Sequence, residues 1–366
     1  MSPSSVSEQA LLEALARVID PHTQKDFVSS KALRDLKIDG TDVSFEVELG
    51  YPAKSVIPAL QQQLLSAARG VAGVSNVSVK IHSKIVSHAV QRGVKLMAGA
   101  RNVIAVASGK GGVGKSTTAV NLALALAAEG ANVGLLDADI YGPSQPTMTG
   151  TSGKPETLDG KLMEPKLKYG LQINSIGFLI SDDQAMVWRG PMASQALEQL
   201  IMQTRWQDLD YLIVDMPPGT GDIQLTLAQK VPLAGAVIVT TPQDIALIDA
   251  KKGIKMFEKV GVPILGLIEN MAVHVCSACG HIEHIFGADG GRKMAQEYGL
   301  NWLGALPLSM DIRQQADSGR PTVVATPDSP AAQLYRDIAI KLAAQVALRA
   351  KDFSAKFPTI TISKDT

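Results

Sequence analysis

A glycine-rich run with two lysines, residues 109 to 117, is the segment of this chain best suited to chemistry. It reads Gly109, Lys110, Gly111, Gly112, Val113, Gly114, Lys115, Ser116 and Thr117, and so satisfies the Gly-x4-Gly-Lys-Ser pattern of a phosphate-binding loop. Glycines let backbone N–H groups turn toward a polyphosphate, and the N-terminus of a following helix adds a favourable dipole. Lys115 is expected to reach the β- and γ-phosphates, and the Ser116 hydroxyl to coordinate Mg²⁺. The loop therefore predicts that the chain binds a nucleoside triphosphate.

The loop contains an additional lysine, Lys110, which bears on how the nucleotide is hydrolysed. An additional cation can offset the charge that develops on a transferring phosphoryl group, as an arginine finger does. The alternative is an exposed surface lysine. The run from Lys110 to Thr117 resembles the loop of the deviant P-loop ATPases, a class that includes the nitrogenase iron protein, MinD, ParA and the tail-anchored-protein targeting ATPase. This resemblance implies that Lys110 crosses a dimer interface and contacts the partner subunit's nucleotide.

Carboxylates follow two further apolar segments that are typical of buried strands. Asp137 and Asp139 come after residues 133–136, and Asp215 comes after residues 211–214. Because α/β sheets place their ligands at the carboxyl ends of their strands, one carboxylate could orient the attacking water while another supports Mg²⁺. The alternative for each is an aspartate that forms a turn or caps a helix. The Pro- and Gly-rich sequence after Asp215 suits a switch loop that senses the γ-phosphate.

Two cysteines, Cys276 and Cys279, are the only ones in the chain and form a Cys-x-x-Cys pair. Such a pair offers two thiolates to a soft metal or a cluster, but it could equally be a redox pair or half of a zinc ribbon. His274, His281 and His284 lie close by in sequence, so a zinc site within one chain is a competitor. Iron–sulfur clusters usually need four cysteines, and two such pairs that meet at a two-fold axis would supply them.

Composition excludes several functional classes. Lys plus Arg (35) balances Asp plus Glu (35), which argues against a broad electrostatic surface for nucleic acid or an anionic membrane. No apolar run reaches the roughly 18 residues that span a bilayer. The N-terminal sequence lacks the basic and apolar regions of a secretory signal, so a cytoplasmic protein is expected. Aromatic residues make up only 4%, which disfavours single-strand binding by stacking.

The alternation of apolar segments predicts an α/β protein with a doubly wound, mostly parallel sheet, preceded by a small α+β domain. We expect four parts: a small domain at 1–85, a linker at 86–101, a P-loop ATPase domain at 102–350 and a tail at 351–366. The expected strands are 43–49, 77–81, 103–107, 133–136, 171–176, 211–214, 236–239 and 264–268. The expected helices are 7–18, 57–69, 117–129, 194–204, 245–260 and 331–349.

Several motifs taken together resemble the Mrp/ApbC family of iron–sulfur cluster carrier ATPases over about residues 100 to 350. The matching segments are 109–117, Asp-Ile-Tyr-Gly-Pro-Ser at 139–144, Trp-Arg-Gly-Pro-Met at 188–192, Asp-Met-Pro-Pro-Gly-Thr-Gly-Asp at 215–222 and Glu-Asn-Met at 269–271 with Cys276 and Cys279. Residues 1–85 resemble the small domain often fused to bacterial members, through Asp20-Pro21 and the order of helices and strands. That domain has no cysteine here, so it is not expected to ligate a cluster.

The resemblance implies roles for individual residues. Cys276 and Cys279 would bridge a [4Fe–4S] cluster with their symmetry mates in a homodimer. Asp139 matches the water-activating carboxylate of deviant P-loop ATPases, Asp215 the Mg²⁺-linked one, and Asn270 a residue that contacts adenine in relatives. Family members are cytoplasmic, hydrolyse ATP slowly and hand clusters to apoproteins. Packing or dimer contact is the expected role of 188–192.

An ATP-dependent cluster carrier, with recipient apoproteins and cluster-assembly factors as partners, is therefore the leading hypothesis. The first alternative is a positioning ATPase like MinD or ParA. The tail from residue 351 is short and broken by Pro358, unlike a basic amphipathic membrane helix, and the net charge of zero gives no support for DNA binding. No membrane and no nucleic acid partner is expected. The second alternative is an ATPase whose Cys-x-x-Cys pair holds a structural zinc ion.

Overall fold

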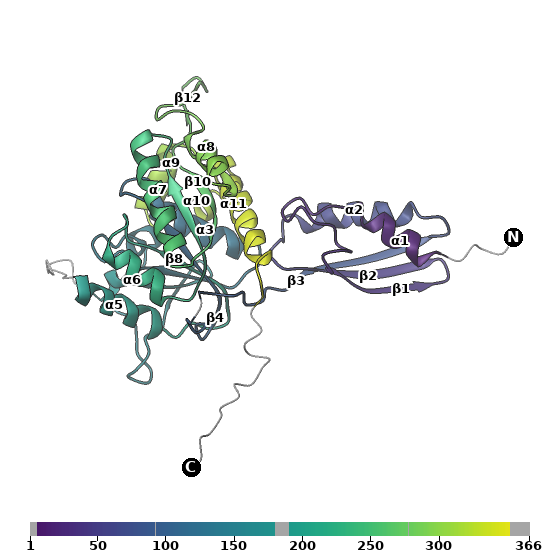
Figure 1. Ribbon diagram of the computed structural model, residues 1–366, viewed down its shortest axis with the longest axis horizontal. Coiled ribbons are helices and arrows are strands. Elements are labelled where there is room, and N and C mark those ends of the chain that lie inside the picture. Colours follow the sequence, from purple (N-terminus) through teal and green to yellow (C-terminus); the bar gives the residue numbers. More distant parts are fainter. Residues whose placement is uncertain (1–5, 92, 180–189, 277, 352–366) are drawn as a thin grey trace, which may run out of the picture.

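The chain folds around two β-sheets that lie side by side (Figure 1). The computed structural model describes residues 6–91, 93–179, 190–276 and 278–351. The smaller sheet lies near the N-terminus with two helices, and the larger sheet occupies the remainder of the described chain, with helices on both faces.

The small sheet has the strand order β1-β2-β3, with β1 antiparallel and β3 parallel to β2. Its elements are α1 (Glu8–Leu15), β1 (Leu33–Asp39), β2 (Asp42–Leu49), α2 (Ile57–Arg69) and β3 (Asn76–Ser83). The expected strands 43–49 and 77–81 and the helix 57–69 are confirmed, whereas the first helix ends at Leu15 rather than at residue 18. Strand β1 escaped prediction because its pairing shifts between Arg34 and Lys37, which breaks the period-two pattern.

The large sheet is doubly wound, as the sequence predicted. Its strand order is β13-β10-β9-β4-β8-β5-β7-β6, and all its neighbouring strands are parallel except β6 and β7. Its strands are β4 (Ala100–Ala107), β5 (Val133–Asp137), β6 (Lys166–Lys168), β7 (Leu171–Ser175), β8 (Leu209–Asp215), β9 (Leu233–Thr240), β10 (Ile264–Glu269) and β13 (Trp302–Ala305). Its helices are α3 (Lys115–Ala128), α4 (Gln145–Thr149), α5 (Gly190–Met202), α6 (Asp222–Lys230), α7 (Asp244–Lys259), α8 (Gly290–Glu297), α9 (Met310–Asp317), α10 (Thr322–Ala325) and α11 (Pro330–Ala347).

Two layers of buried apolar side chains hold the helices on this sheet. One layer lies under α3 and α11, and the other lies on the opposite face under α5, α6, α7 and α8. Strand β4 contributes to both, since Ile104 and Val106 face the first layer while Val103 and Ala105 face the second. A strand buried on both faces reads as a continuous apolar run, which is why the sequence identified it. Because β4 runs directly into the phosphate-binding loop, both layers fix the position of that loop.

Residues 84–99 form no named helix or strand in their described part, but they pack tightly on the large sheet. The buried Gln91 donates to the carbonyls of Ala228 (2.7 Å) and Val231 (3.0 Å) and accepts from the amide of Leu233 (2.9 Å). Ala100 and Arg101, which the sequence assigned to a linker, are the first residues of β4. The expectation of a linker up to residue 101 is therefore corrected.

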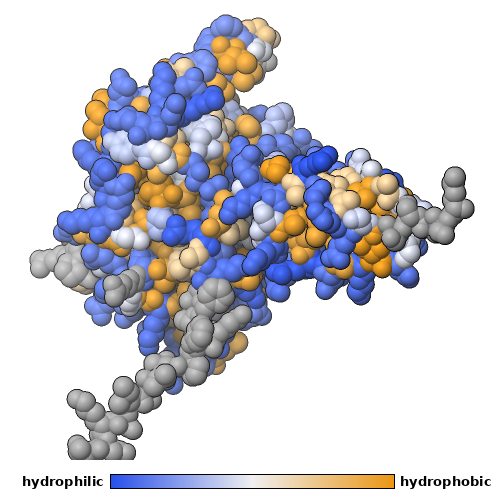
Figure 2. Space-filling model, turned by 45° about the vertical axis from the view of Figure 1, so that its right-hand side comes forward, coloured by the Kyte–Doolittle hydropathy of each residue, from blue (hydrophilic) through white to orange (hydrophobic). Residues whose placement is uncertain are grey.

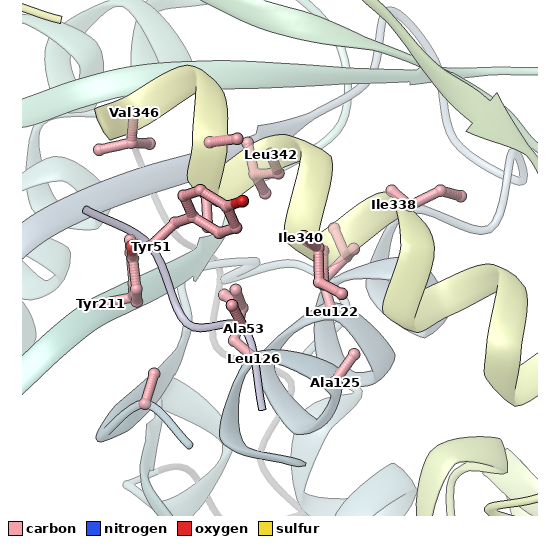
Figure 3. Packing of buried hydrophobic residues seen from close by; sticks show 14 of the residues in the cluster. Tyr51, Ala53, Leu122, Ala125, Leu126, Tyr211, Ile338, Ile340, Leu342 and Val346 are labelled. Atoms are coloured by element: carbon pink, nitrogen blue, oxygen red, sulfur yellow. The ribbon is translucent and has the colours of Figure 1, made fainter. Parts of the chain in front are cut away.

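The two sheets share a packed junction. Figure 3 shows Tyr51 and Ala53, from the loop after β2, beside side chains of α3 and α11 such as Leu126 and Leu342. The side chain of Glu129, at the end of α3, accepts from the amide of Ser55 at 2.8 Å. Helix α3 thus begins at the phosphate-binding loop and ends against the small domain.

Candidate functional site

The phosphate-binding loop joins β4 to α3 at the centre of the large sheet, as predicted. Gly112 (φ 81°) and Gly114 (φ 80°) have left-handed backbone conformations, which glycine adopts without steric cost. At Gly109 the requirement is different, because an added Cβ would lie 2.1 Å from the carbonyl carbon of Asp249 in α7. The motif glycines therefore serve both the turn of the loop and its close approach to a neighbouring helix.

Lys115 and Asp215 meet in the interior of the site. The Nζ atom of Lys115 donates to the Oδ1 atom of Asp215 and to the hydroxyl of Ser116 at 3.1 Å. It also lies 3.9 Å from the carboxylate of Asp139. Lys115 is 6% exposed and Asp215 is fully buried. The structure thus brings together four residues that the sequence selected, from α3, β8 and the segment after β5.

The two carboxylates after β5 have different surroundings. Asp137 accepts four hydrogen bonds: from the amides of Asp139 (3.1 Å), Ser144 (2.9 Å) and Gln145 (3.0 Å) and from the hydroxyl of Ser175 (3.0 Å). Burial, together with the charge of Asp215, raises the pKa of Asp137 to about 7. Asp137 therefore shapes the loop after β5.

Asp139 keeps a free acceptor. Its Oδ1 atom is buried and has no hydrogen-bond partner within the described residues. Burial raises the pKa of Asp139, the charge of Lys115 opposes this rise and the charge of Asp215 adds to it. An unpartnered buried oxygen beside a lysine can accept a hydrogen bond from a water molecule, which is what the predicted water-activating role requires.

Sequence reasoning missed Gln145, the first residue of α4. Its side chain is fully buried, and its Nε2 atom donates to the Oδ2 atom of Asp215 at 2.9 Å and to the carbonyl of Ser116 at 3.0 Å. Its Oε1 atom has no partner among the described residues. Gln145 therefore ties the first turn of α3 to the carboxylate at the end of β8. The only signal in the sequence was its place shortly after the paired aspartates.

Cys276 and Cys279 lie in a short hairpin formed by β11 (His274–Val275) and β12 (Ile282–Glu283). Both thiols are free, and Cys279 is exposed. Backbone amides of Cys279 and Ala278 hydrogen-bond to the sulfur of Cys276 and lower the pKa of that thiol. A turn whose amides point at sulfur favours the thiolate, the form that binds metal.

The hairpin projects from the large sheet and carries apolar side chains in solvent. Figure 2 shows hydrophobic residues at the tip of the projection at the top of the molecule. Val275 is 49% exposed, Ile282 58% and Ile285 52%. Apolar residues gathered around an exposed and a half-buried cysteine are typical of a surface that another protein covers.

The histidines near the cysteines do not complete a metal site. The Nδ1 atoms of His274 and His284 lie within hydrogen-bonding distance of the carbonyls of Leu308 (3.2 Å) and Ala272 (3.1 Å). Within the described part of the chain, no group of three or more His, Cys, Asp or Glu residues is placed to hold a metal ion. The competing zinc site within one chain therefore has no support from the geometry.

Comparison with known proteins identifies the family. A model of the family described as "NUBPL iron-transfer P-loop NTPase" matches residues 99–343, more than half of the chain. The chain belongs to this family. As a member of the NUBPL-type iron-transfer P-loop NTPases it is an ATPase. A second model, for a domain described as "Iron-sulfur cluster assembly protein", matches residues 8–81.

Similar proteins of this NTPase family span most of the chain. An iron-sulfur cluster carrier protein of Pseudomonas fragi is 58% identical over 279 residues, which cover 76% of this chain and 97% of that protein. One from Escherichia coli K12 is 51% identical over 333 residues, which cover 91% of this chain and 90% of that protein. The iron-sulfur cluster transfer protein NUBPL of Mus musculus is 50% identical over 296 residues, which cover 80% of this chain and 92% of that protein.

Solved structures support the NTPase fold. A nucleotide-binding protein of Archaeoglobus fulgidus in complex with ADP is 36% identical, with a TM-score of 0.56 over 64% of this chain and 91% of that one. The cell division ATPase MinD of Pyrococcus furiosus, 21% identical with a TM-score of 0.51 over 66% of this chain and 98% of that one, shows the fold alone. In the part of the chain that the structure describes, no helix is long and apolar enough to cross a bilayer.

The family resemblance also singled out Asn270, Lys110 and the 188–192 motif. Asn270, the residue after β10, donates from Nδ2 to the carbonyl of Val113 at 2.9 Å, so it supports the phosphate-binding loop. Its expected contact with adenine stays a prediction. The side chain of Lys110 makes no ion pair with the described residues. Trp188 and Arg189 of the 188–192 motif lie outside the described residues.

We predict that Gln145→Leu raises the Mg²⁺ concentration needed for half-maximal ATP hydrolysis several-fold. The reason is that the carboxylate of Asp215 loses the hydrogen-bond donor that orients it. The unfolding free energy should fall by about 1–3 kcal/mol, since buried partners are left unsatisfied. Titration of the ATPase rate with Mg²⁺ measures the first effect.

The matched control for this prediction is Gln91→Leu. Gln91 is also buried and its Nε2 atom also donates two hydrogen bonds, both of them to carbonyls at the opposite end of the strands. It should lose similar stability and keep the Mg²⁺ requirement of the wild type. An unchanged requirement in Gln145→Leu would assign Gln145 a purely structural role.

Proposed function

We propose that this protein is an ATP-dependent carrier that binds an iron–sulfur cluster between two copies of the chain and transfers it to apoproteins. The names of the relatives that are 50–58% identical support the cargo. The observation that carries the proposal is the exposed hairpin with Cys276 and Cys279, which belongs to the same domain as the phosphate-binding loop. A [4Fe–4S] cluster is the cargo that fits two such pairs.

The cysteine hairpin supports a shared site for two reasons. One chain has two cysteines, which is half of the usual ligand set of a cluster. The apolar side chains beside them, Val275 and Ile282, would lose their contact with water when a second hairpin covers them. A two-fold axis at the hairpin would therefore complete the thiolate set and bury the apolar tip in one step.

For the nucleotide, residues 109–117 would cradle the phosphates of ATP, with Lys115 leaving Asp215 for the β- and γ-phosphates. The side chains at this site suit a Mg²⁺ ion, which prefers oxygen ligands. They offer the hydroxyl of Ser116, the carboxylate of Asp215 and the unpartnered Oδ1 of Asp139. Mg²⁺ would be held by Ser116 and, through water, by Asp215, and would neutralise phosphate charge. Asp139 would accept a proton from the attacking water, while Lys110 reaches the partner's nucleotide and Asn270 the adenine.

Coupling between ATP and the cluster would run through the loop after β8. The amide of Gly219 donates to the carbonyl of Ser108 at 3.0 Å, so this loop is tied to the strand end that enters the phosphate-binding loop. We infer that γ-phosphate contacts at residues 215–222 close the dimer and change the geometry at the cysteines.

Recipient apoproteins and cluster-assembly factors are the partners of the proposed carrier, and it has no nucleic acid or membrane partner. We place it in the cytoplasm. We also propose two domains, one formed by residues 1–85 and the other running from the start of β4 at Ala100 to residue 350, with the tail starting at 351. A positioning role like that of MinD is disfavoured, since the likeness to MinD shows only the fold.

Anaerobic reconstitution with iron and sulfide tests the proposal. We expect about four irons and four sulfides per dimer for the wild type, and loss of both in Cys276→Ala and Cys279→Ala, while ADP binding is retained. His281→Ala is the matched control, because it removes a metal-binding side chain from the same turn without removing a thiolate. It should keep the full cluster. Stoichiometric zinc that depends on both the cysteines and His281, with no iron, would instead indicate an ATPase with a structural zinc site.

A further inference from the structure

A cavity of about 330 Å³ lies at the junction of the small domain with the rest of the chain, remote from the phosphate-binding loop and the cysteine hairpin. The small domain contributes the loop that contains Asp20 and Lys31 and the end of β2. The other wall comes from the end of α11 with Lys351, and from the segment that contains Lys84 and His88. A cavity of this volume is within the range of small-molecule sites, and such sites occur preferentially between domains.

Positive charge predominates around this junction cavity, although the whole chain has a net charge of zero. Five cationic side chains line it against two carboxylates; the cations are Lys25, Lys31, Arg34, Lys84 and Lys351, and the carboxylates are Asp20 and Glu48. Glu48 is shared between Arg34 (4.0 Å) and Lys84 (3.1 Å). Within the described residues, Lys25, Lys31 and Lys351 have no carboxylate within 4.0 Å. The rim therefore has an excess of cations available for an anion.

The second carboxylate, Asp20, is committed to the loop that forms the wall. It is 3% exposed and accepts hydrogen bonds from the hydroxyls of Tyr51 (2.8 Å) and Thr23 (2.9 Å) and from the amide of His22 (2.9 Å). These donors compensate its charge, so it opposes an anion only weakly. The floor beside it is apolar, since Phe27, Leu49 and Tyr51 line the same cavity.

His88 adds a buried acceptor to the wall. Its ring is 1% exposed, and its Nδ1 atom lies 2.9 Å from the Oδ1 atom of Asn102. The Nδ2 atom of Asn102 donates to the carbonyls of Val86 and Asp210, which fixes its Oδ1 atom as an acceptor. Nδ1 of His88 is therefore the donor, and burial lowers the pKa of His88, so Nε2 is a bare acceptor. That atom has no partner in the described chain.

We propose that the junction cavity binds a small hydroxycarboxylate. Its carboxylates would pair with Lys25, Lys31 and Lys351, its carbon skeleton would lie on the apolar floor, and its hydroxyl would donate to the Nε2 atom of His88. Because the walls come from both domains, the bound anion fixes the small domain against α11. The site is independent of the cluster site and of the proposed carrier activity.

Isothermal titration of the full chain with citrate tests this assignment. Saturating ADP keeps citrate from the phosphate-binding loop, and buffer freed of divalent metals on a chelating resin leaves no metal for citrate to chelate. We expect one citrate per chain, and about thirtyfold weaker binding by the double variant Lys25→Glu with Lys31→Glu, since the two reversals together remove an attraction of about 2 kcal/mol. Lys37→Glu reverses an exposed charge of the same domain outside the cavity and should bind like the wild type.

Tricarballylate, which is citrate without its hydroxyl, tests the role of His88. It should bind several-fold more weakly than citrate to the wild type. Equal affinity for the two acids would overturn the assignment of the hydroxyl to His88. No binding of citrate, or equal binding by the wild type and the double lysine variant, would overturn the site. None of these outcomes depends on the iron content of the protein, so they leave the carrier proposal untouched.

Discussion

Lys115→Met should lower the rate of ATP hydrolysis by about a hundredfold or more, because Lys115 is the one buried lysine or arginine that the described residues place at the phosphate-binding loop. It should also destabilise the protein without nucleotide. Asp215, fully buried, would lose the ammonium group that neutralises it. Removing one partner of a buried ion pair costs about 3–5 kcal/mol, of which the remaining bond from Gln145 would recover a part. Denaturant unfolding and steady-state hydrolysis measure the two effects.

The loss of stability in Lys115→Met should depend on pH. Lys115 lowers the pKa values of Asp137 and Asp139, so its removal raises both further. A carboxyl whose pKa is raised by folding contributes its full stability below the unfolded value, and this contribution is lost as the pH rises through the folded pKa. The gap in unfolding free energy between wild type and variant should therefore widen as the pH rises above about 6, through the folded pKa of Asp137 of about 7.

Lys110→Met is the matched control for this prediction. It removes the same charge from the same loop, but Lys110 is only half-buried and makes no ion pair with the described residues. We expect unchanged stability and retained ADP binding, with slower hydrolysis if Lys110 reaches the partner's nucleotide. Equal destabilisation by the two variants would show that burial of the Lys115–Asp215 pair does not stabilise the fold.

The parts of the site that could be predicted are those that are contiguous in sequence. The run from Gly109 to Thr117 is one local structure, so its strand, turn and helix follow from adjacent residues. Asp139 and Asp215 were found because parallel strands end at one edge of the sheet. Gln145 was missed because its role depends on two contacts, one to Ser116 and one to Asp215, 29 and 70 residues away.

The elements that escaped prediction are short or paired irregularly. Strand β13 has four residues and shifts its pairing with β10 between Leu267 and Ile268, so no periodic pattern marks it. The segment 86–101 was predicted to be a linker because the hydrogen bonds of its buried part, such as those of Gln91, go to distant residues rather than along a helix or strand. The junction of Tyr51 with α11 had no local signal at all, since packing between domains depends on shapes that only the folded chain presents.

Among single glycine-to-alanine substitutions in the phosphate-binding loop, Gly109→Ala should lower the unfolding free energy most. The new Cβ would lie 2.1 Å from the carbonyl carbon of Asp249, 2.2 Å from its oxygen and 2.5 Å from the amide nitrogen of Ala250. These are backbone atoms, so no side chain can turn away. Helix α7 is also held in place, because Ala250 and Ile254 are fully buried. We expect a loss of about 3 kcal/mol in unfolding free energy, the upper part of the range for overpacked sites, and much weaker ADP binding.

Two neighbouring glycines turn this prediction into a ranked series. Gly111→Ala meets nothing within 4 Å and should leave stability in the absence of nucleotide nearly unchanged. Gly112→Ala also meets no atom, but its φ of 81° is left-handed, so it should cost about 1–2 kcal/mol through backbone strain alone. Unfolding of all three variants without nucleotide separates these causes. If Gly109→Ala were as stable as Gly111→Ala, the close contact between the loop and α7 would not be part of the fold in solution.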